Sequence, residues 1–159
     1  MTTEENIRSR LATAEQDPQK LAAAVSGLPE KVLRYKPSPD KWCIQEILGH
    51  LADVEIVYGY RLRHILADSN PTILPMEQDS WAQNLGYLEA SAPELVAQYA
   101  LLRRSNLRLL RRLKPSDLDK GAFHPELKRN ISVADIIELL ATHGPSHLKQ
   151  IETLKSEAR

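Results

Sequence analysis

The stretch 132–154, SVADIIELLATHGPSHLKQIETL, decides the fold of this chain. Its apolar side chains recur every three or four positions, which is the period of one buried face of an α-helix. This face consists of Val133, Ile136, Leu140, His143, His147, Ile151 and Leu154. Ser132 precedes the helix and Asp135 follows three residues later, a variant of the capping box that predicts a helix beginning at this point.

Two histidines occupy positions of this face that normally hold Leu, Ile or Val. Residues four apart are neighbours on a helix, roughly 5–6 Å apart at Cβ, so His143 and His147 can converge on one ion. A third, His50, lies between Ile47 and Val54 on the apolar face of an earlier helix. Three inward imidazoles from two helices predict a site for one divalent metal ion. The alternative is a set of buried histidines satisfied by ordinary hydrogen bonds.

The other two histidines lie outside these faces. His64 falls late in the earlier helix and His124 in a loop before Pro125, and we expect both at the surface. The acidic residues nearest to His50, Asp53 and Glu55, also lie off the apolar face. We expect them at most to accept a hydrogen bond from a ligand histidine.

Helical periods recur along the whole chain, and the alternation typical of strands is almost absent. We therefore expect an all-α fold, a four-helix bundle. The long helices are expected at about 3–26, 44–67, 92–113 and from 133 onward. The connection 70–91 is too long for a simple loop, and a short helix near 77–85 is expected within it.

Proline interrupts two of the predicted helices. Asp17-Pro18 predicts a kink or short break in the first helix, because the ring nitrogen cannot donate a hydrogen bond. Gly144-Pro145 falls between two of the predicted ligands and predicts a local kink there. The single cysteine, Cys43, is expected to be a weak N-cap of the second long helix, paired with Glu46, rather than a nucleophile.

The third long helix carries mainly apolar residues on one face and arginines on the other. Its core face consists of Leu95, Tyr99, Leu102, Asn106, Leu109 and Leu113, and its other half carries Arg103, Arg104, Arg108, Arg111 and Arg112. We interpret the arginines as a solvated face rather than as a surface that contacts RNA or DNA, because no aromatic residues lie among them and the chain is neutral. Tyr99 and Asn106 are polar groups among leucines, and they are candidates either for core hydrogen bonds or for contact with a substrate.

The composition is that of one domain spanning residues 1–159. A chain of 159 residues with 42% hydrophobic content can bury one core. The formal net charge is zero, so no overall field attracts nucleic acid. No apolar run approaches the ~18 residues of a membrane span. We expect a cytoplasmic protein that binds neither nucleic acid nor a membrane.

Two stretches resemble a known family. WCIQEILGHLADVE, residues 42–55, is similar to the second-helix signature of the DinB/YfiT-like superfamily of bacterial four-helix bundles. Residues 132–147 resemble the last helix of the same family. The sequence departs from the family at Cys43, where Ser is usual, and at the Gly144-Pro145 step.

The resemblance implies a bundle with a long crossover connection between the second and third long helices. It places the metal triad of the family on His50, His143 and His147, with nickel or zinc as the ion. It further implies a small-molecule substrate and a homodimer. Some members of the family are transferases or isomerases that use a low-molecular-weight thiol, and others are described as metal-dependent hydrolases.

Three kinds of function remain open at this stage. A hydrolase needs a general base near the metal, and no residue has a suitable spacing, which favours a metal-dependent transferase that brings a thiol to small electrophiles. The alternatives are a metal-dependent hydrolase, and a metal-containing bundle that acts in protein association without catalysis.

Overall fold

The computed structural model describes residues 3–158. Four long helices form the body: α1 (Thr3–Val25), α3 (Ile44–Ala67), α5 (Ala92–Leu110) and α6 (Val133–Glu157). Short elements join them: α2 (Glu30–Leu33), α4 (Gln78–Asn84), the 3-10 turn η1 (Pro115–Asp117), and the strands β1 (Gly121–His124) and β2 (Arg129–Ser132). The predicted four-helix bundle is confirmed, and a small hairpin is added to it.

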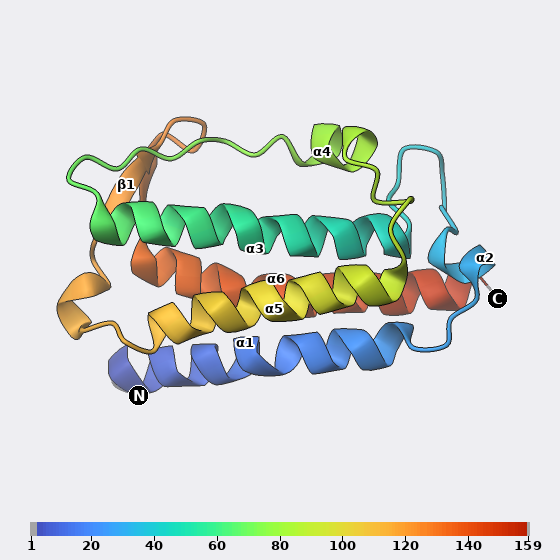
Figure 1. The fold of residues 1–159 in the computed structure, drawn as a ribbon, viewed down its shortest axis with the longest axis horizontal. Coiled ribbons are helices and arrows are strands. Elements are labelled where there is room, and N and C mark those ends of the chain that lie inside the picture. The colour runs from blue at the N-terminus through green and yellow to red at the C-terminus, as the bar shows by residue number, and fades with distance from the viewer. Residues whose placement is uncertain (1–2, 159) are drawn as a thin grey trace.

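The four long helices lie side by side, and each packs against two neighbours. α1 contacts α5 and α6, and α3 contacts the same two helices from the other side. Figure 1 shows α1 and α6 running in one direction and α3 and α5 in the other. Because α3 and α5 are parallel, the chain must return along the full length of the bundle between them. The segment that contains α4 makes this return along the outside of α3 (Figure 1), which is the predicted long crossover.

The hairpin adds two short strands to the predicted all-α bundle. β1 and β2 pair antiparallel, with Ala122 opposite Ile131, at the end of the bundle where α6 begins. Ala122 and Ile131 are buried and extend the core below the strands. Strands of four residues are too short to show an alternating pattern above the helical signal, so the sequence suggested only a loop here.

The helix ends follow the predicted capping residues. Ser132 Oγ accepts a hydrogen bond from Asp135 N at 3.1 Å, and this contact begins α6. Cys43 N donates to Glu46 Oε2 at 2.8 Å at the start of α3. The thiol of Cys43 is fully buried and burial raises its pKa, which agrees with a structural role.

Both prolines lie inside helices that the structure keeps unbroken. α1 continues through Pro18 and α6 continues through Pro145. Since α6 is one helix, its two histidines keep their positions one turn apart. In the described part of the chain, no helix is both long enough and apolar enough to cross a membrane.

The core consists of two apolar clusters at the two ends of the bundle. One includes Leu48 and Ile151, and the other includes Leu62 and Ile136. Between them lies a layer of buried polar side chains, which consists of Asp17, His50, Glu55, Arg103 and Asn106. The histidines of α3 and α6 meet at the level of this layer.

Candidate metal centre

Three histidine rings converge between α3 and α6. His50 Nε2 lies 3.3 Å from His143 Nε2, which lies 3.1 Å from His147 Nε2. One nitrogen from each ring lies within 4.8 Å of the other two. Nitrogens that share a tetrahedral zinc at about 2.0–2.1 Å are about 3.4 Å apart, so these separations fit one ion.

The protonation of the rings also fits a cation. Burial and the neighbouring His147 lower the pKa of His50 to about 4. Burial and the two neighbouring imidazoles lower the pKa of His143 to about 3. Burial lowers the pKa of His147 as well. At neutral pH the rings are therefore uncharged, which is the form that ligates a metal ion.

Hydrogen bonds among the three rings do not satisfy all of their nitrogens. His147 Nδ1 lies 3.0 Å from Gln150 Oε1 and must donate its proton there, which leaves a lone pair on Nε2. His143 has one proton for two nitrogen neighbours, so one of the two short contacts has no satisfactory hydrogen-bonding arrangement. His50 Nδ1 is buried without a partner, while the Trp42 ring packs 4.7 Å from the His50 ring.

A cavity of about 270 Å³ opens beside the triad. Its wall is formed by α3, the crossover, the turn of the hairpin and α6. The lining residues are His50, Val54, Tyr58, Arg61, Met76, Gln78, His124, Glu126, Leu127, Leu139 and His143. Two of the three converging histidines therefore face a space that can admit a small molecule.

His124 lies in this cavity, contrary to the prediction that it is a surface residue. It is the last residue of β1 and is only 6% exposed. The hairpin, which the sequence did not reveal, folds it inward over α3. His64 stays at the end of α3, where it pairs with Asp68 and stacks on Tyr60.

The other candidate residues make contacts elsewhere. Asp53 accepts a hydrogen bond from Tyr87 at 2.6 Å. Tyr99 accepts one from Arg103 Nη2 at 2.8 Å, and Asn106 donates to both the backbone and the carboxylate of Glu55. None of these three candidates is among the described residues that line the cavity at the triad.

Arg103 corrects the prediction of a fully solvated arginine face. It is 1% exposed, whereas Arg104, Arg108, Arg111 and Arg112 are exposed. Its guanidinium bonds to Glu55 at 2.8 Å and lies 3.3 Å from Asp17, so a buried cation joins α5 to α3 and α1. Burial raises the pKa of Asp17 to about 6 against the opposing effect of Arg103.

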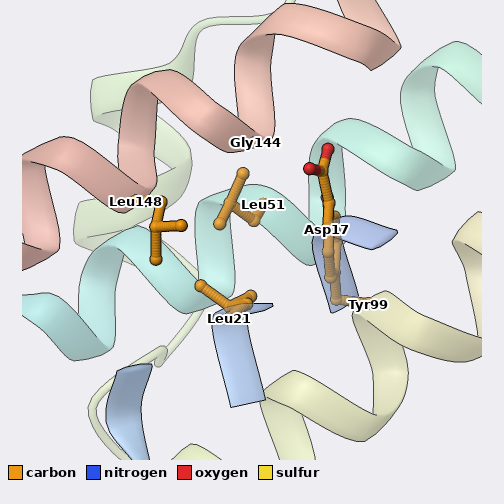
Figure 2. Close-up of a pocket in the computed structure, with 6 residues that line it drawn as sticks. All are labelled: Asp17, Leu21, Leu51, Tyr99, Gly144 and Leu148. Atoms are coloured by element: carbon orange, nitrogen blue, oxygen red, sulfur yellow. The ribbon is translucent and has the colours of Figure 1, made fainter. Parts of the chain in front are cut away.

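A second, much smaller cavity lies inside the bundle behind the triad. Its volume of about 10 Å³ is that of about one water molecule. Figure 2 shows its lining, with the Asp17 carboxylate directed toward the α6 backbone at Gly144. A Cβ at Gly144 would lie 2.5 Å from Asp17 Oδ2, so glycine permits the close approach of these helices.

Comparison with known proteins gives one consistent family. The model of the DinB superfamily matches residues 13–151. A "putative metal-dependent hydrolase" of Bacillus mycoides strain KBAB4 is 30% identical over 96% of this chain and 87% of its own length. Another protein of that name, from Oceanobacillus iheyensis, is 30% identical over 88% of this chain and 80% of its own length.

A solved structure agrees in fold. YfiT from Bacillus subtilis, described as a probable metal-dependent hydrolase with an unusual four-helix bundle topology, superposes with a TM-score of 0.91. The match covers 99% of this chain and 90% of that one, at 23% identity. By sequence and by fold, this chain belongs to the DinB superfamily.

Proposed function

We propose that this protein is a metal-dependent hydrolase that acts on a small molecule in the cavity beside the His50–His143–His147 triad. The observation that carries the proposal is the meeting of three uncharged imidazoles at a cavity of about 270 Å³, where His143 Nε2 lies 3.3 Å from His50 Nε2 and 3.1 Å from His147 Nε2. The names of the relatives support hydrolysis rather than the thiol transfer that the sequence had favoured.

The three histidines would hold the ion, with zinc or nickel as the candidates. Three neutral ligands leave a divalent cation its full charge, so it supplies Lewis acidity that can polarise a substrate or activate water. The remaining side chains of the cavity then have to bind the substrate and manage protons.

Two titratable groups on the cavity wall can transfer protons. Leu127 N donates to His124 Nδ1 at 3.4 Å, so the neutral ring carries its proton on Nε2 and can donate it to a developing negative charge. Glu126 is exposed at the same cavity and can accept a proton. The sequence favours thiol transfer because no base has a suitable spacing, whereas the position of His124 and Glu126 on the cavity wall supports hydrolysis.

A panel of p-nitrophenyl esters and anilides tests the proposal with protein loaded with zinc or nickel. We expect turnover without added thiol, loss of turnover in His147→Ala, and a fall in kcat of about 10²–10⁴ in His124→Gln. His64→Gln is the matched control and should keep wild-type rates. Turnover only with a low-molecular-weight thiol would assign the protein as a transferase, and metal binding without any turnover would support a non-catalytic bundle.

A further inference from the structure

Arg61 lines the same cavity as His50 and His143 of the triad. It follows His50 by eleven residues on α3, which corresponds to about 16 Å along the helix axis. Long helical side chains turn toward the N-terminus of their helix, and this direction brings the guanidinium back toward the triad. Arg61 and His50 line one continuous space.

Arg61 is buried without an acidic partner. It is 5% exposed, and Arg61 has no ion pair with any carboxylate whose position the structure describes. Its Nη2 donates to Leu74 O at 2.6 Å, its Cζ lies 4.8 Å from the Tyr58 ring centroid, and its Nε has no hydrogen-bond partner. A buried cation without a partner is unfavourable, so this position suits an anion that arrives from outside.

Arg103 provides the comparison within the same molecule. Arg103 is also buried, but the carboxylates of Glu55 and Asp17 neutralise its charge. It therefore needs no anion from outside. Arg61 faces a cavity, and its guanidinium is held in place by a carbonyl and an aromatic ring. The difference lies in the missing carboxylate.

We propose that the cavity binds substrates that carry a carboxylate, which pairs with Arg61 while the reacting group lies at the histidine triad. This inference rests on the proposed function for the reacting end. A guanidinium offers several charge-assisted N–H donors, which match a planar carboxylate.

The charge and polarity of the cavity narrow the class of substrate. Burial and the charge of Arg61 lower the pKa of His124, so it adds no cation at neutral pH, and Glu126 is the other charged residue of the wall. One guanidinium suits a monoanion better than a phosphate dianion. Val54, Leu127 and Leu139 lie along the same wall, so a short apolar segment should separate the carboxylate from the reacting group.

Calorimetric titration with hexanoate, and with hexanamide as its neutral isostere, tests this class of substrate without requiring turnover. Wild-type protein should prefer hexanoate by about tenfold or more, the usual gain from a charge-assisted hydrogen bond. Arg61→Gln should bind the two ligands within about twofold of each other and keep its metal. Arg108→Gln, an exposed arginine of α5, is the control and should keep the preference.

The variant His147→Ala distinguishes two possible binding sites for the carboxylate, which are Arg61 and the metal ion. If the carboxylate pairs with Arg61, this variant loses metal and keeps the preference for hexanoate. Equal binding of the two ligands by the wild type, or a preference that survives Arg61→Gln and disappears in His147→Ala, would overturn the proposal. Failure of the hydrolase assays would leave this binding result unchanged.

One measurement does not depend on any variant that has to fold. In wild-type protein labelled with both 13C and 15N, the Arg61 Nε–H resonance can be assigned through its side-chain carbons. Hexanoate should shift this resonance in a saturable way, and hexanamide should not. A resonance that both ligands leave in place would reject Arg61 as the carboxylate partner.

Discussion

Arg103 repairs a defect that proline creates in a neighbouring helix. Pro18 has no N–H, so the carbonyl of Ala14, four residues earlier in α1, loses its helical partner. Arg103 Nη1 donates to Ala14 O at 3.0 Å and to Leu140 O of α6 at 2.8 Å. One buried side chain of α5 thereby supplies the missing hydrogen bond of α1 and adds a hydrogen bond to α6.

Replacement of Arg103 by Met should destabilise the fold by about 3–5 kcal/mol, because it leaves Glu55 and Asp17 buried without a cation. Urea unfolding followed by circular dichroism measures the free energy of unfolding. Arg104→Met, at the adjacent exposed position, should change it by no more than about 0.5 kcal/mol. Equal effects of the two substitutions would show that the buried network contributes little.

Asp17 should make stability depend on pH. Its pKa rises from 3.8 to about 6 in the folded chain, so between about pH 4 and 6 the folded state keeps a proton that the unfolded state has released. Stability from this group is therefore present below pH 4 and is lost as the pH rises through 6, by up to about 3 kcal/mol. Asp17→Asn should remove this part of the slope in unfolding titrations at pH 4–7. An identical slope in both proteins would refute the assignment.

At the residue scale, periodicity could predict the triad but not the burial of Arg103 and His124. His50, His143 and His147 stand on apolar faces, where the spacing reveals their direction. Arg103 lies at the border of such a face, and long charged side chains there are normally solvated. His124 becomes buried only through the pairing of two short strands, which is a tertiary effect that its neighbours in sequence do not encode.

Among the elements, the end of the crossover is held against the start of α3. Tyr87 is 5% exposed, its ring packs on the Gly49 backbone, and Gln45 Nε2 donates to Tyr87 O at 3.3 Å. The Tyr87 hydroxyl donates to Asp53. These contacts fix the returning chain beside the helix that carries His50.

The substitution Gly49→Ala tests this packing. It has two opposing effects on the free energy of unfolding. Alanine favours a helix by about 1 kcal/mol over glycine, but a Cβ at this position would overlap the Tyr87 ring, and overpacking typically costs 1–3 kcal/mol. We expect net destabilisation of about 1–2 kcal/mol in thermal or urea unfolding. In a Tyr87→Ala background the same substitution should be neutral or stabilising. Destabilisation of equal size in both backgrounds would exclude the ring as the cause.

The elements were more predictable than their connections. The expected helix at 44–67 coincides with Ile44–Ala67, and α4 falls within the expected 77–85, because caps and prolines are local signals. The third long helix ends at Leu110 rather than 113, a difference of the size that fraying at helix ends produces. The hairpin depends on pairing between β1 and β2. The local hydrophobic periodicity of the sequence therefore did not predict it.

For the whole molecule, the parallel arrangement of α3 and α5 determines where the cavity can form. The crossover must pass over α3, and together with the hairpin turn it closes a space that α3 and α6 alone would leave open. The long connection therefore contributes to the candidate site as well as to the topology. The family resemblance implied such a crossover. The identity of the residues that line the cavity follows only from the three-dimensional structure.

The homodimer implied by the family resemblance remains a prediction at this scale. Light scattering coupled to size-exclusion chromatography should give twice the mass of one chain at micromolar concentration. A mass equal to one chain across the accessible concentrations would contradict it. The triad comes from a single chain, so the candidate metal site would be complete in either case.

Metal content tests most directly the claim that three histidines hold one ion. Elemental analysis should be made on protein purified without an affinity tag and exposed to zinc or nickel, beside His147→Ala and the control His64→Gln. We predict one divalent ion per chain in the wild type and in His64→Gln, and almost none in His147→Ala. A wild type without stoichiometric metal, or an unchanged content in His147→Ala, would contradict a shared ion at these rings.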